Sequence, residues 1–424
     1  MTANRPVPQL VEHLFRHAFG RIVAALVRVF GPDQLQACED VVQEALLRAL
    51  QNWPFQGVPD QPEGWLLQVA KNLALDRVRH QRMAARREQD LVAWAQRAAP
   101  TGPPPDEVAD DTLRMMFVCC HPSLSFEARV ALTLKTLCGF AVPEIARAFL
   151  AKEATIAQRL VRAKEQLRQE RVDFVLPPPR QLAARLHDVL AVLYLLFNEG
   201  YAATSGDDAV RRELVHEAVR LTRLLAADPV LGVPGVHALL ALMLLQGARL
   251  PARADASGDL LTLAQQDRSR WDAGWVHEGL QRLAQAMTGS ELTRYHVEAA
   301  IASCHAVAPD YAATDWAAIL RHYERLRVLA PSAVVELNRA VAVAKVEGAR
   351  AGLAALRAAG LEVALAGYAL LPATEGMLRW QLGELAVAAT CFAAALELPG
   401  SEPEKSLLRA RLTACQRGDA APRW

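Results

Sequence analysis

Residues 64–82, GWLLQVAKNLALDRVRHQR, combine basic, amide and aromatic side chains in a pattern that suits contact with unpaired nucleic acid. Apolar residues recur every three or four positions, which predicts a helix with one face turned inward. The outer face would carry the side chains that could do chemistry: Trp65, Lys71, Asn72, Asp76, Arg79 and Arg82. Basic groups can neutralise phosphates, an aromatic ring can stack on an unpaired base, and amides can reach base edges. The structural alternative is a solvated helix face, with Trp53 and Trp65 as core residues.

A second basic face is predicted near the end of residues 132–168. One helix ends near Gly139, and Pro143 suits the first turn of the next helix, because its missing N–H would be unpaired there in any case. After a short turn, Thr155 is a suitable N-cap for the following helix. That helix would turn four apolar residues inward: Ile156, Leu160, Ala163 and Leu167.

The opposite stripe of this helix carries polar and basic side chains: Thr155, Gln158, Arg159 and Arg162. Two short helices, a tight turn and an outward basic stripe predict a helix-turn-helix whose second helix enters the major groove. There, Arg and Gln can make bidentate contacts with guanine and adenine edges. A packed helical hairpin that binds no nucleic acid would show the same apolar spacing, so the DNA-binding interpretation depends on the basic stripe.

The distribution of charge points to two separate contacts with a polyanion. The chain has 47 basic and 46 acidic residues, which leaves almost no net charge. Residues 71–97 and 147–171 nevertheless each hold seven basic and three acidic residues, in a region, 1–175, that is otherwise acidic. Two such segments fit two contacts with nucleic acid, although two solvated helix faces would give the same counts.

The elements that would position these side chains are helices. Strand signals are scarce over the 424 residues and apolar residues recur at helical spacing almost throughout, so we expect an all-α protein. Two breaks divide the chain: a Pro-, Gly- and acid-rich linker at 98–111, and Pro177-Pro178-Pro179, which a helix cannot cross. The predicted blocks are 8–97, 107–175 and 180–424.

Metal and enzyme chemistry find little support in the sequence. The seven cysteines form no C-x-x-C pair, which predicts reduced thiols rather than a disulfide framework or a zinc ribbon. Cys119-Cys120-His121 lacks a second ligand pair, and neighbouring residues on a helix point in different directions. His296 and Cys304-His305 accompany no nucleophile elbow, phosphate loop or HExxH motif. We therefore expect no metal, no cofactor and no catalytic activity.

A membrane location is not expected. The longest purely apolar runs, such as Val189–Phe197, have about half of the roughly 20 residues that a membrane span needs. The N-terminus lacks a basic segment followed by an apolar stretch, so no secretory signal is predicted. These features favour a cytoplasmic protein.

The third block, 180–424, is predicted to be a stack of helical pairs. Residues 381–400 resemble the second half of a tetratricopeptide repeat, with small, aromatic and turn residues near that repeat's spacing: Gly383, Ala388, Phe392, Ala395 and Pro399. Gly348 lies 35 residues before Gly383, about one repeat length. Such stacks usually present a concave surface to a protein or peptide. Polar residues that could line it are Asn198, Glu199, Asp207, Asp208, Asp267, Arg268, Arg270, Trp271 and Asn338. The alternative is that they cap helices and tie repeats together.

Taken in order, the motifs resemble a bacterial sigma factor of the extracytoplasmic-function (ECF) class, in the sigma-70 family. The resemblance covers roughly residues 8–170 and rests on EDVVQEALLRAL (39–50), a Pro-rich loop (54–62) that follows Trp53, the helix 64–82, a linker, and VPEIARAFLAKEATIAQRLVRAKEQLR (142–168). With the further helical residues, the whole chain resembles the ECF group that carries a tetratricopeptide-like C-terminal extension. In that group NEGY and DRSRWD match recurrent stretches, and the extension is thought to control or support activity without a membrane anti-sigma partner.

The resemblance implies a role for each matched position. An acidic-amide face, Asp40, Gln43 and Glu44, would dock on the coiled coil of the core RNA polymerase beta-prime clamp, and the beta flap would be a second contact. The loop 54–62 would capture a flipped base of the promoter −10 element, which the outer face of helix 64–82 would melt and read. Thr155, Gln158, Arg159 and Arg162 would read the −35 element. Two departures affect the turn of the helix-turn-helix: Leu150-Ala151 stands where the family often has Gly, and Val142 replaces the usual polar cap.

Three hypotheses follow for the whole chain. In the first, residues 8–97 bind polymerase and open the −10 DNA, 107–175 read the −35 DNA, and 180–424 regulate. In the second, the chain is a helix-turn-helix regulator that binds duplex DNA without polymerase and uses its repeats as an effector domain. In the third, it is a scaffold without DNA contact. Residues 39–82 favour the first, because a plain regulator has no use for a docking face followed by a base-capturing loop.

Overall fold

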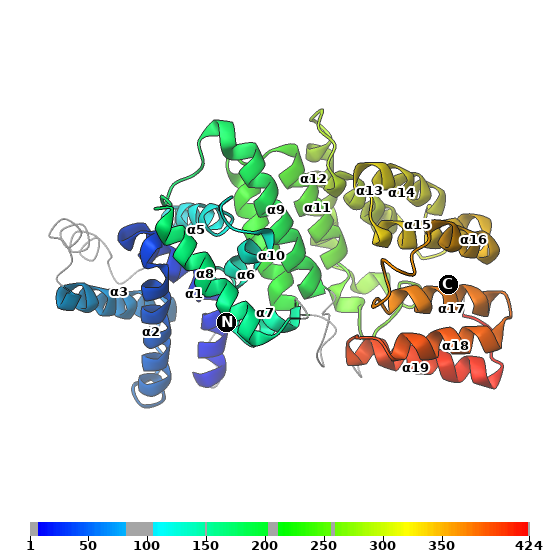
Figure 1. Ribbon diagram of the computed structural model, residues 1–424, viewed down its shortest axis with the longest axis horizontal. Helices are drawn as coiled ribbons and strands as arrows, with labels where there is room; N and C mark the ends of the chain where they lie inside the picture. Colours follow the sequence, from blue (N-terminus) through cyan, green and yellow to red (C-terminus); the bar gives the residue numbers. More distant parts are fainter. Residues whose placement is uncertain (1–6, 82–104, 149–150, 202–210, 256–258, 423–424) are drawn as a thin grey trace. The chain divides into compact units, whose positions relative to one another are not determined.

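The computed structural model describes residues 7–81, 105–148, 151–201, 211–255 and 259–422. Over these ranges the chain forms helices (Figure 1), and apart from one isolated bridge between Ala254 and Leu260 it contains no strand. The predicted all-α class is therefore confirmed. The chain divides into two compact units, 1–193 and 194–424.

The first unit opens with a bundle of three long helices: α1 (Val7–Phe30), α2 (Leu35–Gln56) and α3 (Pro62–Gln81), with a short 3-10 helix, η1 (Pro32–Gln34), between α1 and α2. The apolar faces of α2 and α3 turn into the bundle, where Val42, Ala45 and Ala70 are fully enclosed. The loop between α2 and α3 is shorter than the predicted 54–62. Pro54 lies inside the last turn of α2, and Gly57 (φ 84°) ends that helix, because its N–H bonds to the Trp53 carbonyl.

The other helices described before Pro177 are α5 (Pro105–Cys119), α6 (Phe126–Thr136), α7 (Val142–Ala148) and α8 (Glu153–Gln169). The predicted linker 98–111 is wrong from Pro105 onward, where α5 begins; 98–104 lies outside the described residues. The predicted N-cap Thr155 is also wrong. Lys152 is the N-cap, because its extended backbone directs its carbonyl to the N–H groups of Thr155 and Ile156. Thr155 therefore lies in the first turn of α8, and Pro143 lies in the first turn of α7 as predicted.

The predicted break at the three prolines is confirmed, since α9 (Pro179–Tyr201) starts at the last of them. The first part of α9 belongs to the first unit. Arg185 donates to the backbone carbonyl of Phe117, and Asp188 pairs with Arg129 at 2.5 Å. The boundary between the units, at residues 193 and 194, therefore falls within α9 and later than the predicted start of the third block.

The second unit continues with α10 (Arg212–Ala227), α11 (Pro234–Gly247), η2 (Leu250–Ala252), η3 (Arg268–Arg270), α12 (Ala273–Ala286) and α13 (Arg294–Val307). Helix α11 packs against α10, α12 and α13, and ten of its residues are buried. Among the described residues, Pro234–Ala252 is the one segment long and apolar enough to cross a membrane. Because 72% of it is buried inside the structure, a central core helix accounts for its composition.

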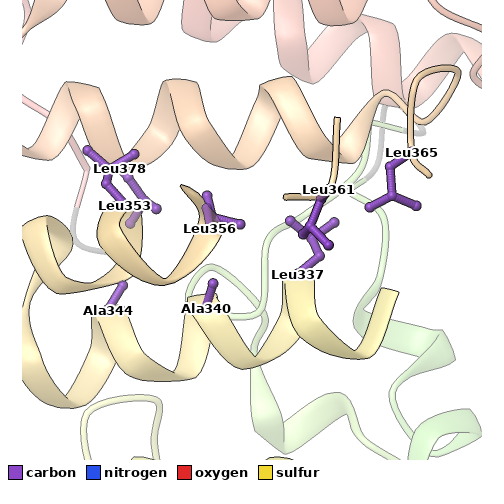
Figure 2. Packing of buried hydrophobic residues seen from close by; sticks show 8 residues of the cluster. All are labelled: Leu337, Ala340, Ala344, Leu353, Leu356, Leu361, Leu365 and Leu378. Atoms are coloured by element: carbon purple, nitrogen blue, oxygen red, sulfur yellow. The ribbon is translucent and has the colours of Figure 1, made fainter. Parts of the chain in front are cut away.

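The second unit ends in successive helical pairs: α14 (Trp316–Leu329), α15 (Ala333–Glu347), α16 (Ala349–Ala359), α17 (Leu370–Gln381), α18 (Leu385–Leu396) and α19 (Glu402–Arg417). Figure 2 shows leucines of α15 and α16 meeting Leu378 of α17 in one apolar cluster. Gly348 (φ 94°) and Gly383 (φ 78°) form the turns within the α15–α16 and α17–α18 pairs, a backbone region that favours glycine. Ala388, Phe392 and Ala395 are buried, as their repeat-like spacing predicts.

Candidate nucleic-acid interface

Helix α8 presents a polar face opposite its buried one. Ile156, Leu160, Ala163 and Leu167 are at most 5% exposed, as predicted, and anchor α8 against α6 and α7. A hollow of about 320 Å³ lies on the other side, between α8 and the start of α6. All four predicted DNA-facing residues line it: Thr155, Gln158, Arg159 and Arg162. The structure thus brings the predicted −35 set together on one accessible surface.

The charge around this hollow is shaped by the N-terminus of α6. Ser125 caps α6 and accepts a hydrogen bond from the backbone N–H of Ala128. The pKa of Glu127 is lowered by backbone and Ser125 hydrogen bonds, and the nearby guanidinium of Arg159 contributes to the same shift. A carboxylate close to Arg159 can hold its fork in position and is also a charge that an incoming phosphate must face.

The predicted −10 face of α3 is only partly assembled. Asn72 and Asp76 are exposed, and Asn72 accepts a hydrogen bond from the Gln68 amide at 3.2 Å. Trp65 is half-buried and packs edge-on against the buried Trp53, with ring centroids 5.4 Å apart. Of the two tryptophans, Trp53 is therefore a core residue, whereas Trp65 keeps part of its ring accessible. The Arg79 side chain and all of Arg82 lie outside the described residues.

The predicted outward position of Lys71 is wrong, because its side chain is 1% exposed. Lys71 follows Leu67 by four positions and precedes Ala74 by three, so it falls on the same stripe of α3 as these two buried residues. A side chain enclosed in the bundle does not face DNA. The apolar spacing alone would have shown this if Lys71 had been assigned by position rather than by charge.

The predicted docking face on α2 is assembled in full. Asp40, Gln43 and Glu44 lie three and four positions apart and are all partly exposed. The Asp40 carboxylate accepts from the Gln36 amide at 2.7 Å, and Glu44 pairs with Arg48 at 3.2 Å. These exposed contacts are weak and easily exchanged for a partner's groups.

Exposed apolar side chains extend this face toward the end of α2. Leu47 is 54% exposed and Phe55, in the last turn of α2, is 90% exposed. Neither was singled out from the sequence. The signal that could have found them is a large apolar side chain outside the buried stripe of α2.

A buried ion pair links α2 to α8. Glu39 accepts hydrogen bonds from the Thr136 hydroxyl of α6 at 2.7 Å and from the Lys164 ammonium of α8. Lys164 also donates to the Gln36 amide oxygen at 2.7 Å. Glu39 falls on the inward stripe of α2 with Val42 and Leu46, which is the sequence signal for a carboxylate that needs a buried partner. The helix with the −35 set is thereby fixed to the helix with the docking face.

Two stretches of the first unit match regions of known protein families. Residues 14–84 match sigma-70 region 2, and residues 114–167 match sigma-70 region 4. The chain contains regions 2 and 4 of the sigma-70 family. These two regions contain every predicted docking and DNA-facing residue, and they imply binding to core RNA polymerase and promoter DNA. Residues 185–287 match a family of unknown function, DUF6596.

The chain is similar to one relative over most of its length and to others over part of it. It is 39% identical over 395 residues, 92% of each chain, to the uncharacterized protein R00370 of Rhizobium meliloti (strain 1021). It is 26% identical to the probable ECF RNA polymerase sigma factor SigI of Mycobacterium tuberculosis, over 47% of this chain and 75% of SigI. It is 34% identical to the ECF RNA polymerase sigma factor SigK of Mycobacterium sp. (strain KMS), over 26% of this chain and 59% of SigK. No solved structure matches the chain.

Proposed function

We propose that this sigma factor directs promoter-specific transcription initiation in the manner of the ECF class, and that its second unit regulates that activity. Asp40, Gln43 and Glu44 dock on the polymerase clamp, Trp65, Asn72 and Asp76 contact the opened −10 DNA, and the α8 set reads the −35 duplex. The observation that carries the proposal is the hollow beside α8, where all four predicted −35 residues converge. We expect the protein to act in the cytoplasm with polymerase and to catalyse nothing by itself.

In the first unit, the helices α3 and α8 lie too close together to contact both promoter elements at once. We call this arrangement closed. Two elements about 25 base pairs apart are separated by about 85 Å along B-form DNA. Helix α2 has 22 residues, so it is about 33 Å long, and both α3 and α8 contact it or its immediate neighbours. The two reading helices cannot reach both elements from these positions. Promoter binding therefore separates α8 from α2 and breaks the Glu39–Lys164 pair.

The exposed −35 face fits this order of events. Gln158 and Arg162 are exposed in the closed arrangement, so α8 can meet duplex DNA before the unit opens. Polymerase then binds α2, which carries Glu39, and −35 DNA binds α8, which carries Lys164. Their combined binding free energy would offset the loss of that pair.

Transcription in vitro with core polymerase tests the proposal. Run-off transcripts should require the full chain and core enzyme and should fall when either the −10 or the −35 sequence is substituted. Duplex binding without polymerase, combined with no transcript from any promoter in the presence of core enzyme, would instead support the polymerase-independent regulator. Genome-wide mapping of the transcripts would give the promoter sequence.

A test of the regulatory role of the second unit requires a truncated chain whose first unit is intact. A chain ending at residue 178 loses Arg185 and Asp188, which bond to Phe117 and Arg129 of the first unit. A chain ending at Tyr201 keeps these contacts. If the second unit regulates, the 1–201 chain should differ from the full chain in transcription while keeping its affinity for −35 duplex. Equal transcription from both chains on every promoter would contradict the regulatory role.

The occupant of the helical pairs is proposed to be a protein or peptide. The pairs α15–α16 and α17–α18 repeat the same turn glycine 35 residues apart, and Leu353 is buried in the first pair where Ala388 is buried in the second. This supports a tetratricopeptide-like stack, and such stacks commonly bind extended peptides. Affinity capture with the 194–424 region as bait, compared with the full chain, would identify the partner, and the absence of any saturable partner would contradict this part of the proposal.

A further inference from the structure

Three arginines surround two aromatic rings in the second unit. Arg249 follows α11, Arg253 follows η2, and Arg268 begins η3. The guanidinium carbon of Arg253 lies 4.1 Å from the ring centroid of Tyr201, and those of Arg268 and Arg249 lie 4.7 and 5.6 Å from that of Trp271. All five residues fall within 185–287, the stretch that matches a family of unknown function.

Carboxylates of the described residues make no ion pair with this cluster. Other partly buried arginines of the unit pair with acids, as Arg220 does with Glu217 and Arg294 with Glu298. Among the described residues, no ion pair includes Arg249, Arg253 or Arg268. Three mutually repelling cations held together without an acid mark a region of strong positive potential.

The three guanidiniums differ in how many hydrogen-bond acceptors they contact. Arg268 donates to the backbone carbonyls of His305 and Ala308 beyond the end of α13, so it ties two segments together. Arg249 has a hydrogen bond from Nε to the Gln266 amide oxygen, at 3.2 Å. The Nε of Arg253 is buried and has no acceptor within the described chain. Arg249 and Arg253 are therefore the two with donors to spare.

Two further buried donors face the same cluster. The indole N–H of Trp271, a residue only 8% exposed, and the O–H of Tyr201 each have no acceptor within the described chain. Buried donors nearly always have an acceptor, so a group of them without one calls for an explanation. Four neighbouring side chains offer hydrogens here, and few acceptors within the described chain meet them: the Gln266 amide oxygen on Arg249 and the Tyr201 oxygen beside Arg253.

The electrostatic environment agrees with this geometry. Burial raises the pKa of Tyr201, but the nearby charges of Arg249 and Arg253 outweigh it and lower that pKa below its usual value. The pKa of His305 is lowered to about 4 by its burial and by Arg249 and Arg268. A tyrosine hydroxyl and an imidazole thus both experience the positive field of the cluster.

We propose that Arg249, Arg253, Tyr201 and Trp271 form a binding site for a small oxyanion group, a phosphate or a carboxylate. Arg249 and Arg253 are half-buried residues, so part of each side chain borders the solvent from which an anion would come. Their planar forks match the oxygens of such a group. The rings that carry the Tyr201 and Trp271 donors lie against these guanidiniums, and rotation of the arginine side chains would let the bound oxygens accept from these donors as well. The site would supply the second unit with a small-molecule ligand whether or not the promoter role is correct.

Calorimetric titration of the full chain tests the site. Sodium phosphate, sodium sulfate and sodium acetate are each titrated against sodium chloride at matched ionic strength, with thermal unfolding followed in parallel. We expect saturable binding and a rise in Tm with at least one oxyanion, and the preferred one distinguishes a phosphate ligand from a carboxylate ligand. Arg249→Gln and Arg253→Gln should weaken that binding by about tenfold or more, because each removes a charge-assisted fork.

Two further variants separate binding from folding. Arg220→Gln, which removes a guanidinium paired with an acid in the same unit, should bind like the parent chain. Trp271→Phe keeps the aromatic ring but removes the indole N–H, and it should weaken binding severalfold while the protein stays folded. Stabilisation equal to that by chloride, unchanged affinity in the folded Arg253→Gln protein, or binding confined to nucleic acid or acidic peptides would overturn the proposal.

Discussion

Glu39 on α2 and Lys164 on α8 form an ion pair inside the first unit, where the Glu39 side chain is only 1% exposed. The hydroxyl of Thr136, on α6, donates a second hydrogen bond to the Glu39 carboxylate. One carboxylate therefore connects three helices, two of which belong to the region that would read the −35 element. This contact joins α6 and α8 to α2 within the first unit.

Removing the ammonium should destabilise the first unit. Lys164→Met leaves the Glu39 carboxylate buried without its charged partner, and we expect the free energy of unfolding to fall by about 3 kcal/mol. Arg168→Met is the matched control, because its pair with Glu165 is exposed and is worth less than about 1 kcal/mol. Urea unfolding measures both, and the double variant Glu39→Leu with Lys164→Met should recover most of the loss. A Lys164→Met protein no less stable than the control would show that the pair contributes nothing.

Arg159 should determine affinity in a sequence-dependent way. Arg159→Ala removes a fork from the hollow beside α8, and we expect it to weaken binding to the preferred −35 duplex by about 1–3 kcal/mol. Arg168→Ala, on the same helix but outside the hollow, is the control. Fluorescence anisotropy on matched and base-substituted duplexes measures the effect. An equal loss on every sequence would show a phosphate contact and not base recognition.

The acidic-amide face of α2 should determine affinity for polymerase. Asp40→Ala with Glu44→Ala removes two partly exposed charges that hold no buried partner, so folding should be unaffected while core binding weakens by about tenfold or more. Glu63→Ala is the control, since it removes an exposed acid that pairs with Arg21. Co-purification with core enzyme and surface plasmon resonance test this. Retention of full affinity by the double variant would place the docking surface elsewhere.

Stability of the second unit should depend on pH through His305. Its pKa is about 4 in the folded chain, because burial and the charges of Arg249 and Arg268 disfavour the protonated ring. The unfolded chain protonates histidine near pH 6.5, so between about pH 6.5 and pH 4 the unfolded state binds more protons and stability rises with pH. The expected loss between pH 7 and pH 4 is about 3 kcal/mol from this group.

His305→Gln should remove that part of the pH dependence. Urea unfolding across pH 4–7 is compared for the parent, for His305→Gln and for His277→Gln, whose ring is exposed on α12. We expect a shallower slope only in His305→Gln. Parallel slopes for all three proteins would mean that the His305 ring titrates alike in the folded and unfolded chains.

The helical pattern could be predicted from the sequence where one period dominates. The inward faces of α2 and α8 follow from apolar spacing alone, and the turn glycines Gly348 and Gly383 follow from their separation. Helix boundaries were harder, because they depend on backbone geometry. Lys152 caps α8 by directing its carbonyl at two N–H groups, and lysine has no side-chain preference that would predict this role. Similarly, Pro105 begins α5 inside a segment whose composition suggests a linker.

The site could be predicted where surface residues share a helix face, but not where partners come from distant parts of the chain. Thr155, Gln158, Arg159 and Arg162 are neighbours on α8 by periodicity. Lys71 was misplaced because its charge outweighed its position in the apolar stripe. The Glu39–Lys164 pair joins residues 125 positions apart, and only the fold brings them together. The cluster around Arg249 depends in the same way on three separate segments.

Single-molecule energy transfer between dyes on α2 and α8 tests the central claim most directly. Gln51 and Gln169 are exposed and outside the proposed contacts, so they are suitable labelling positions. In the free chain the efficiency should be high, because α2 and α8 are bonded through Glu39 and Lys164. In a complex with core polymerase and promoter DNA that yields run-off RNA, the efficiency should fall to that of helices several tens of ångströms farther apart. Unchanged high efficiency in the transcribing complex would contradict the account.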